Sequence, residues 1–159
     1  GAREIAIMDI SRDRLELRKK LGLPFDSWVD TAKTDPIAWV KERTGGRGAD
    51  GSIDAAGVAP AFKAALASTA PLGHLVVVAM HMEPFQFNAL SLLAGEANIT
   101  GSKTYCNDYP AVIDLMTRGA YPLEGWVTTI PMEGFIDRGI VPLHNQQATK
   151  IMVDVAGAG

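Results

Sequence analysis

The residue whose type and position most clearly indicate a chemical role is Asp9, an acid that ends a short apolar run. The run, residues 5–8, is too short for a helix and is typical of a strand. In sheets that bind dinucleotides, a carboxylate at the end of the second strand accepts hydrogen bonds from the adenosine ribose hydroxyls. Asp9 could bind a ribose in this way, or it could merely begin the turn before the next helix. The local pattern leaves both interpretations open.

The residue types that hold metals or act as nucleophiles are few. A single cysteine, Cys106, excludes an internal disulfide and a cysteine-rich zinc lobe. The three histidines are His74, His81 and His144, and no two of them have metal-ligand spacing. His81 follows a strand-like run and could face a cleft, although an ordinary loop histidine is the simpler interpretation. We therefore expect no metal site in this chain and a reducing, cytoplasmic setting.

The elements that must position these residues alternate between strand and helix patterns. This alternation predicts an α/β fold with a parallel sheet and crossover helices. Strands are predicted near residues 5–8, 27–30, 51–55, 75–80, 97–101, 127–130 and 150–155. Helices are predicted after Ser11, after Asp35 and after Pro131, and near residues 59–70, 88–93 and 109–117.

Length and composition limit the classes of protein to consider. The 159 residues suit one domain, and 47% hydrophobic with 21% charged residues is ordinary for a globular protein. The net charge is −3, without the excess of basic residues that is typical of nucleic-acid-binding proteins, so we expect no nucleic-acid partner. The apolar runs are far shorter than the roughly 20 residues of a membrane span, and the first four residues give no sign of a secretory signal.

Several segments, taken in order, resemble one family. Residues 3–17 look like the second strand and following helix of medium-chain dehydrogenases. The sequence TGGRGAD at 44–50 with IDAAG at 53–57 is similar to a signature of that family, and residues 71–79 resemble its fourth strand. Residues 100–113 look closest to the 2,3-butanediol and polyol dehydrogenase branch. The whole chain thus resembles part of a zinc-type alcohol dehydrogenase.

This resemblance implies a Rossmann-like, doubly wound parallel sheet that lacks its first strand and Gly-rich turn. The chain begins on what would be the second strand, so residues 1–159 would form one N-terminally truncated dinucleotide-binding domain with a C-terminal tail strand. The catalytic domain that supplies the zinc ligands in this family would be absent. Ala79 departs from the family pattern, which usually has glycine at that position and so a wider slot for the nicotinamide.

Site residues follow from the resemblance, position by position. Asp9 matches the ribose-binding acid, and Arg14 matches a basic residue that reaches the same ribose. The remaining positions match segments beside the adenosine or backbone that meets the nicotinamide carboxamide. The full set of cofactor-binding residues implied is Asp9, Ile10, Arg14, Ala55, Ala56, Val78, Met80 and Thr104.

The function implied is oxidation of a secondary alcohol, diol or polyol by hydride transfer to NAD. Zinc would belong to the absent catalytic domain only, so this chain would be inactive alone. We also expect a homo-oligomer paired through the strand at 97–101. Two alternatives stay open: a Rossmann-like S-adenosylmethionine-dependent methyltransferase, whose sheet also places an acid at the second strand, and a non-catalytic oligomerising module.

Overall fold

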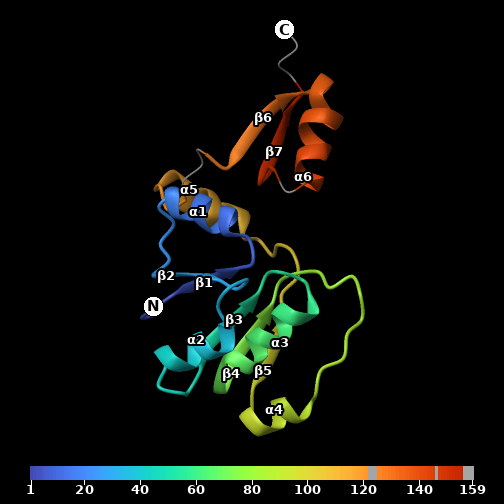
Figure 1. The fold of residues 1–159 in the computed structure, drawn as a ribbon. Helices are drawn as coiled ribbons and strands as arrows, with labels where there is room; N and C mark the ends of the chain where they lie inside the picture. Colours follow the sequence, from blue (N-terminus) through green and yellow to red (C-terminus); the bar gives the residue numbers. More distant parts are fainter. Residues whose placement is uncertain (122–124, 146, 156–159) are drawn as a thin grey trace. The chain divides into compact units, whose positions relative to one another are not determined.

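Strands and helices alternate along most of the chain in the computed structural model, which describes residues 1–121, 125–145 and 147–155 (Figure 1). The strands are β1 (Ala6–Asp9), β2 (Ser27–Asp30), β3 (Ala49–Asp54), β4 (Thr69–Val77), β5 (Asn98–Gly101), β6 (Val127–Pro131) and β7 (Lys150–Asp154). The α-helices are α1 (Arg12–Lys20), α2 (Pro36–Arg43), α3 (Ala59–Ser68), α4 (Leu90–Gly95), α5 (Tyr109–Thr117) and α6 (Val141–His144). The predicted α/β fold with parallel strands is confirmed.

The strands form three separate sheets. Their orders are β1-β2, β3-β4-β5 and β6-β7, and every pairing is parallel. The described residues therefore do not form one continuous sheet. β1 and β3 each keep an edge with no strand beside it in these sheets, and β5 is the other edge of the three-stranded sheet.

The chain divides into two compact units. One contains residues 1–15 and 25–107, and the other contains residues 16–24 and 108–159. The first unit holds the sheets β1-β2 and β3-β4-β5, and the second holds β6-β7. The organisation of residues 1–159 as a single truncated domain stays a prediction.

The core of the first unit lies between α3 and the three-stranded sheet (Figure 1). Phe62 and Leu66 of α3 are buried against Leu75 of β4, which is fully buried. Leu75 pairs with Ser52 and Ile99, so these side chains share the face toward α3. The opposite face carries Ile53, which is 69% exposed, so one face of this sheet is uncovered in the described chain.

Several predicted helix boundaries are confirmed by their caps. Ser11 Oγ accepts a hydrogen bond from Arg14 N at the start of α1, and Gly22 follows α1 with φ +65°. Asp35 Oδ1 accepts from Ile37 N at 2.8 Å and from Ala38 N, with Pro36 at the first helical position. These caps fix the ends because they satisfy backbone groups that the helix leaves unpaired.

Other boundaries differ from the predictions for local reasons. α4 begins at Leu90 and not at Asn88, because the Asn88 side chain accepts a hydrogen bond from Leu90 N and so forms a turn. β4 ends at Val77 and not at residue 80. Val78 N donates to Asp54 O as the parallel register requires, but Ala79 N donates to the same oxygen, so the backbone leaves the strand pattern there.

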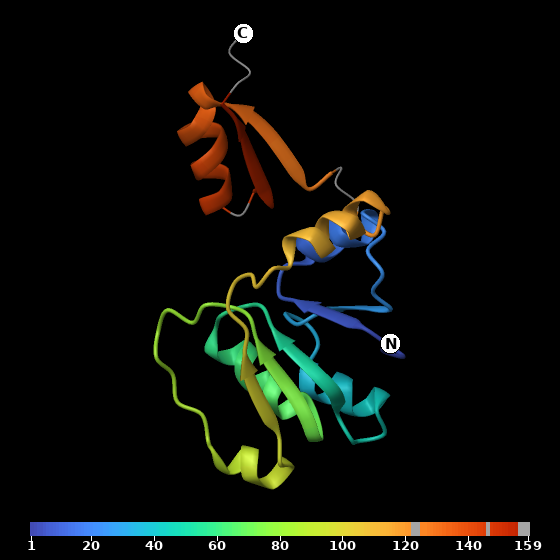
Figure 2. The same cartoon turned by 180° about the vertical axis from the view of Figure 1, so that it is seen from behind.

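The second unit packs an irregular helical segment on the β6-β7 pair. A 3₁₀ turn (Met132–Gly134) and a π-helix (Phe135–Ile140) lead into α6, which makes the predicted short helix longer. Ile130 of β6 is buried beneath it, and Gly139 lets the helix approach, since a Cβ there would lie 3.1 Å from Ile130 Cδ1. Figure 2 shows this helical segment against one side of the two strands. Over the described ranges, no helix is long and apolar enough to cross a membrane.

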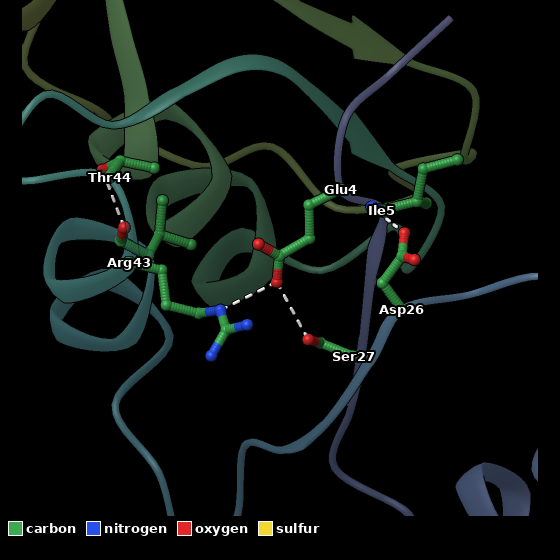
Figure 3. A network of polar contacts seen from close by, with 7 residues as sticks. Glu4, Ile5, Asp26, Ser27, Arg43 and Thr44 are labelled. Atoms are coloured by element: carbon green, nitrogen blue, oxygen red, sulfur yellow. Dashed lines mark hydrogen bonds and ion pairs between the residues drawn. The ribbon is translucent and has the colours of Figure 1, made fainter.

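A polar network joins the residues just before β1 to the start of β2 and to α2 at the protein surface (Figure 3). Glu4 Oε1 accepts from Arg43 Nε at 2.7 Å and from Ser27 Oγ at 3.0 Å. Asp26 Oδ2 accepts from Ile5 N at 2.7 Å. The hydrogen bonds from Arg43 and Ser27 hold the pKa of Glu4 below its ordinary value of 4.5.

Gly48 allows a close approach that a side chain would prevent. Its φ is +100°, and a Cβ there would lie 2.7 Å from Ser68 O and 2.9 Å from Ala70 N. We expect Gly48→Ala to lower the free energy of unfolding by about 2–3 kcal/mol, since backbone atoms cannot move aside easily. Gly45→Ala is the control, because Gly45 has φ +61° but nothing within 4 Å, and about 1 kcal/mol is expected. Urea unfolding of both variants checks this, and equal losses would contradict it.

The Glu4 network predicts a pH-dependent contribution to stability. The lowered pKa of Glu4 means that its ionised form is favoured by folding, so the stabilisation is present above pH 4.5 and is lost as pH falls through the folded pKa. Glu4→Gln should therefore lower the Tm at pH 6 to 7 and converge with wild type in acid. Thermal melts across pH measure this, with Glu42→Gln on the exposed side of α2 as control. A Tm difference that is independent of pH would contradict it.

Candidate functional site

The predicted cofactor-binding residues all lie at or after the carboxyl ends of parallel strands. Those after β3, β4 and β5 lie at the same end of one sheet, because these three strands are parallel neighbours. Asp9 is the last residue of β1, at the carboxyl end of the two-stranded sheet, and Ile10 and Arg14 follow it. Ligands of open parallel sheets bind at such carboxyl ends, where loops carry the polar groups.

Asp9 and Arg14 are brought together as an ion pair. Asp9 Oδ1 lies 3.0 Å from Arg14 Nη2 and accepts a hydrogen bond from Ser11 N at 2.9 Å. The Asp9 side chain is 14% exposed and that of Arg14 is 42% exposed, so the pair opens to solvent mainly through the arginine. The turn after β1 places the acid at the strand end, and the first turn of α1 brings the guanidinium back to it. The arrangement offers both an acceptor and donors to a hydroxyl-bearing ligand.

Ala55 and Ala56 form the turn after β3, and both are exposed. Their position is fixed by Asp54, whose Oδ1 accepts from Ala56 N at 3.0 Å and from Gly57 N at 3.3 Å. This is the local side-chain-to-backbone bonding that aspartate makes in turns. The exposed residues 55–56 thus lie at the carboxyl end of the sheet, and the buried Asp54 side chain fixes the orientation of the Ala56 amide.

Val78 and Met80 follow β4, with 47% and 82% of their surfaces exposed. Val78 N donates to Asp54 O at 3.0 Å, and Ala79 N does so at 3.1 Å. Because the Val78 amide is engaged by the protein, a ligand that forms a hydrogen bond with the backbone of this residue would use its carbonyl group. The same aspartate therefore anchors both the turn after β3 and the segment after β4.

Two predicted residues are not drawn into these contacts. Ile10 is 69% exposed beside Asp9. Thr104 is exposed and has φ +53°, a left-handed conformation that is uncommon for a threonine. Thr104 follows β5, so it shares the sheet edge with residues 55–56 and 78–80.

The residues present do not fit a zinc site. Among the described residues, no group of three or more His, Cys, Asp or Glu side chains could hold a metal ion. Cys106 is exposed. A zinc centre needs three or four converging ligands, so we assign no step of chemistry to a metal in this chain.

Asp54 and His81 form a contact that the sequence pattern did not predict. The Asp54 side chain is fully buried, and His81 Nε2 lies 2.5 Å from its Oδ2. The two residues are 27 positions apart, so spacing gave no signal. An acid that ends a strand beside the turn residues 55–57 was the available clue, because a buried carboxylate needs partners.

Comparison with known proteins places this arrangement in one family. The zinc-binding dehydrogenase family matches residues 1–118. The chain is 27% identical to the (R,R)-butanediol dehydrogenase of Neisseria gonorrhoeae, covering 95% of the chain and 43% of that protein. It is 30% identical to the (R,R)-butanediol dehydrogenase of Bacillus subtilis, covering 96% of the chain and 44% of that protein. The chain thus spans less than half the length of these curated relatives.

The fold agrees with that assignment. The crystal structure of 2R,3R-butanediol dehydrogenase from Bacillus subtilis superposes with a TM-score of 0.86 at 28% identity, covering 98% of this chain and 44% of that one. The match extends over both compact units of the chain, and it corresponds to the C-terminal part of these enzymes. With its parallel strands and the family match over most of its length, this chain belongs to the zinc-binding, medium-chain dehydrogenase family of oxidoreductases.

Proposed function

We propose that this chain holds the NAD of a dehydrogenase that oxidises a secondary alcohol, diol or polyol. The observation that carries the proposal is the Asp9–Arg14 pair at the carboxyl end of β1. A carboxylate there accepts hydrogen bonds from both ribose hydroxyls of an adenosine. The butanediol dehydrogenases among the relatives support the substrate class.

The strand ends divide the cofactor between them in this proposal. Asp9, with Ile10 and Arg14, holds the adenosine ribose, and Arg14 shares its donors between the acid and the sugar. Ala55 and Ala56 line the path beside the adenosine. The backbones of Val78, Met80 and Thr104 meet the nicotinamide carboxamide, with the Val78 carbonyl as acceptor. Bound NAD would accept the hydride, and the residues of this chain orient the ring.

The zinc and its ligands lie outside this chain in the proposal. The described residues offer no ligand cluster, and the relatives are more than twice as long as the aligned segment. We infer that the chain alone does not oxidise alcohols. The segment that supplies the metal would also complete the substrate pocket.

A further strand completes the sheet in the same proposal. β1 and β3 each have an unpaired edge, and unpaired edges expose amide and carbonyl groups that need partners. A parallel strand between them would join β2-β1 and β3-β4-β5 into one doubly wound sheet. The helix that follows such a strand would cover the face that carries Ile53. This strand and its Gly-rich turn would come from sequence before residue 1.

No observation favours the S-adenosylmethionine methyltransferase alternative. Methyltransferase sheets share the acid after the second strand, but the family match is to dehydrogenases. The second alternative, a non-catalytic oligomerising module, applies to this chain in isolation. The edge strand β5 is the feature that supports it, because an edge strand can pair with another chain.

Asp9 predicts a preference for NAD over NADP. A 2′-phosphate would lie against the Asp9 carboxylate, and like charges held close in a partly buried site cost several kcal/mol. We expect Asp9→Asn, in the complete protein, to raise the Kd for NADH about tenfold, because roughly one hydrogen bond to a charged group is lost. The same substitution should lower the Kd for NADPH, because it removes the negative charge that repels the 2′-phosphate. Fluorescence titration with both nucleotides measures this.

The control is Asp13→Asn, an exposed acid in the first turn of α1 that leaves the strand end intact. Both dissociation constants should stay near those of wild type in this variant. A wild-type protein that binds NADPH more tightly than NADH would contradict the role given to Asp9.

We also propose that two copies of the chain pair through β5. β5 is an edge strand, all four of its residues are exposed, and none is a lysine or proline that would blunt the edge. Two-fold pairing of such edges gives a closed dimer.

Thr100→Lys tests this pairing. In a two-fold dimer the substitution places a positive charge on each of the two paired strands, and the two charges repel each other. Light scattering at micromolar concentration should give a dimer for wild type and a lower mass for the variant. Ala67→Lys, at an exposed position of α3, is the control and should stay dimeric. A wild-type protein with the mass of one chain would refute the dimer.

A further inference from the structure

Asp54 is a buried acid with five hydrogen-bond partners from two loops. Its side chain is fully buried at the end of β3. Oδ1 accepts from Ala56 N and Gly57 N, and Oδ2 lies 2.5 Å from His81 Nε2. Its backbone oxygen accepts from the amides of residues 78 and 79. One residue thus ties the turn after β3 to the segment after β4.

His81 is held in place by aromatic rings as well as by the carboxylate. Its side chain is 15% exposed. The ring lies 5.0 Å from that of Phe85 and 6.0 Å from that of Phe62, centroid to centroid. The rings surround the imidazole with apolar groups, and a buried carboxyl group without a hydrogen-bond partner would be costly. A carboxylate accepts hydrogen bonds, so the His81 tautomer with its proton on Nε2 fits this contact.

The two loops also touch directly through Gly57. This residue has φ +71°, and a Cβ there would lie 2.7 Å from Met80 O. The backbone of Met80 therefore packs against the turn that Asp54 caps. Residues 78–81 are held at both ends. The backbone amides of residues 78 and 79 donate hydrogen bonds to Asp54 O, and the side chain of His81 bonds to the Asp54 carboxyl group.

After residue 81 the chain leaves this anchored position. The segment from β4 to α4 runs along the side of the sheet as a long loop (Figure 2). Within this loop the rings of Phe85 and Phe87 pack on Phe62 of α3, with ring centroids 5.0 Å and 5.4 Å apart. Apolar packing of this kind is non-directional, so the hydrogen bond between His81 and Asp54 is the polar contact that holds the backbone of residues 78–81 at its C-terminal end.

We propose that Asp54 and His81 form a positioning pair that sets the Val78–Met80 backbone for the nicotinamide half of the cofactor. This inference rests on the proposed binding of NAD at this sheet edge. Neither side chain is placed on the reacting atoms. The pair acts through the backbone that lies between its two anchors, and the adenosine half, held by Asp9 at the other sheet, does not depend on it.

This division predicts an effect on one half of the cofactor only. His81→Phe in the complete protein keeps an aromatic ring among the phenylalanines but removes the donor to Asp54. We expect the Kd for NADH to rise about tenfold, whereas the Kd for adenosine diphosphate ribose, which lacks the nicotinamide, changes less than about twofold. The fluorescence of bound NADH should also move toward that of free NADH, because the ring is no longer held.

Rescue separates positioning from packing. His81→Gln places an amide donor near the position of Nε2, and we expect its NADH affinity to lie within about threefold of wild type. His81→Asn is too short to reach Asp54 and should behave as His81→Phe does, which keeps the test available if the phenylalanine variant does not fold. His144→Phe in α6 is the matched control, expected to bind both ligands as wild type does.

The outcomes distinguish this inference from the proposed function. Equal losses of NADH and adenosine diphosphate ribose affinity in the His81 variants, or no loss of either, would overturn the positioning role while leaving NAD binding intact. A wild-type protein that binds neither ligand would overturn the proposed function, and this inference with it. Selective loss of NADH affinity, restored by glutamine, is the result that supports the pair.

Discussion

Burial of the Asp54 carboxylate is the constraint on which the geometry of the strand ends depends. A polar group without solvent must find its hydrogen-bond partners in the protein, and here every partner of the side chain belongs to a loop at the carboxyl ends of the strands. Satisfying the acid therefore fixes the loops. The backbone of the same residue marks the end of β4, because Val78 N and Ala79 N both donate to Asp54 O. Asp54 thus contributes its side chain to the loops and its carbonyl group to the strand end.

Most elements of the fold could be predicted because their signals are local. Ser11 and Gly22 bound α1, and Asp35 with Pro36 starts α2, each through a backbone group that the residue type satisfies or leaves open. The sheet arrangement is different, because strand pairing is non-local. Alternation predicted a parallel sheet but gave no sign that β1-β2 and β3-β4-β5 would stand as separate pieces.

The candidate site divides in the same way. The resemblance to dehydrogenases placed Asp9 and Arg14 at one ribose, and the structure pairs them at 3.0 Å within one turn of chain. The contact between Asp54 and His81 could not be predicted from the sequence, because the two residues lie 27 positions apart and only the fold brings them together. Their residue types alone were ambiguous, because most aspartates lie on the surface and histidines occur both inside and outside a protein. Roles that belong to backbone groups, as at Val78, are likewise invisible to side-chain patterns.

Binding of a nicotinamide dinucleotide at the carboxyl ends of these strands is the proposal on which the other roles depend. Calorimetric titration of the complete protein with NADH and, separately, with S-adenosylmethionine is its sharpest test, because both ligands carry the same adenosine ribose that Asp9 would hold. We expect saturable binding of one NADH per chain and no measurable heat from S-adenosylmethionine. Saturable binding of S-adenosylmethionine without binding of NADH would contradict it.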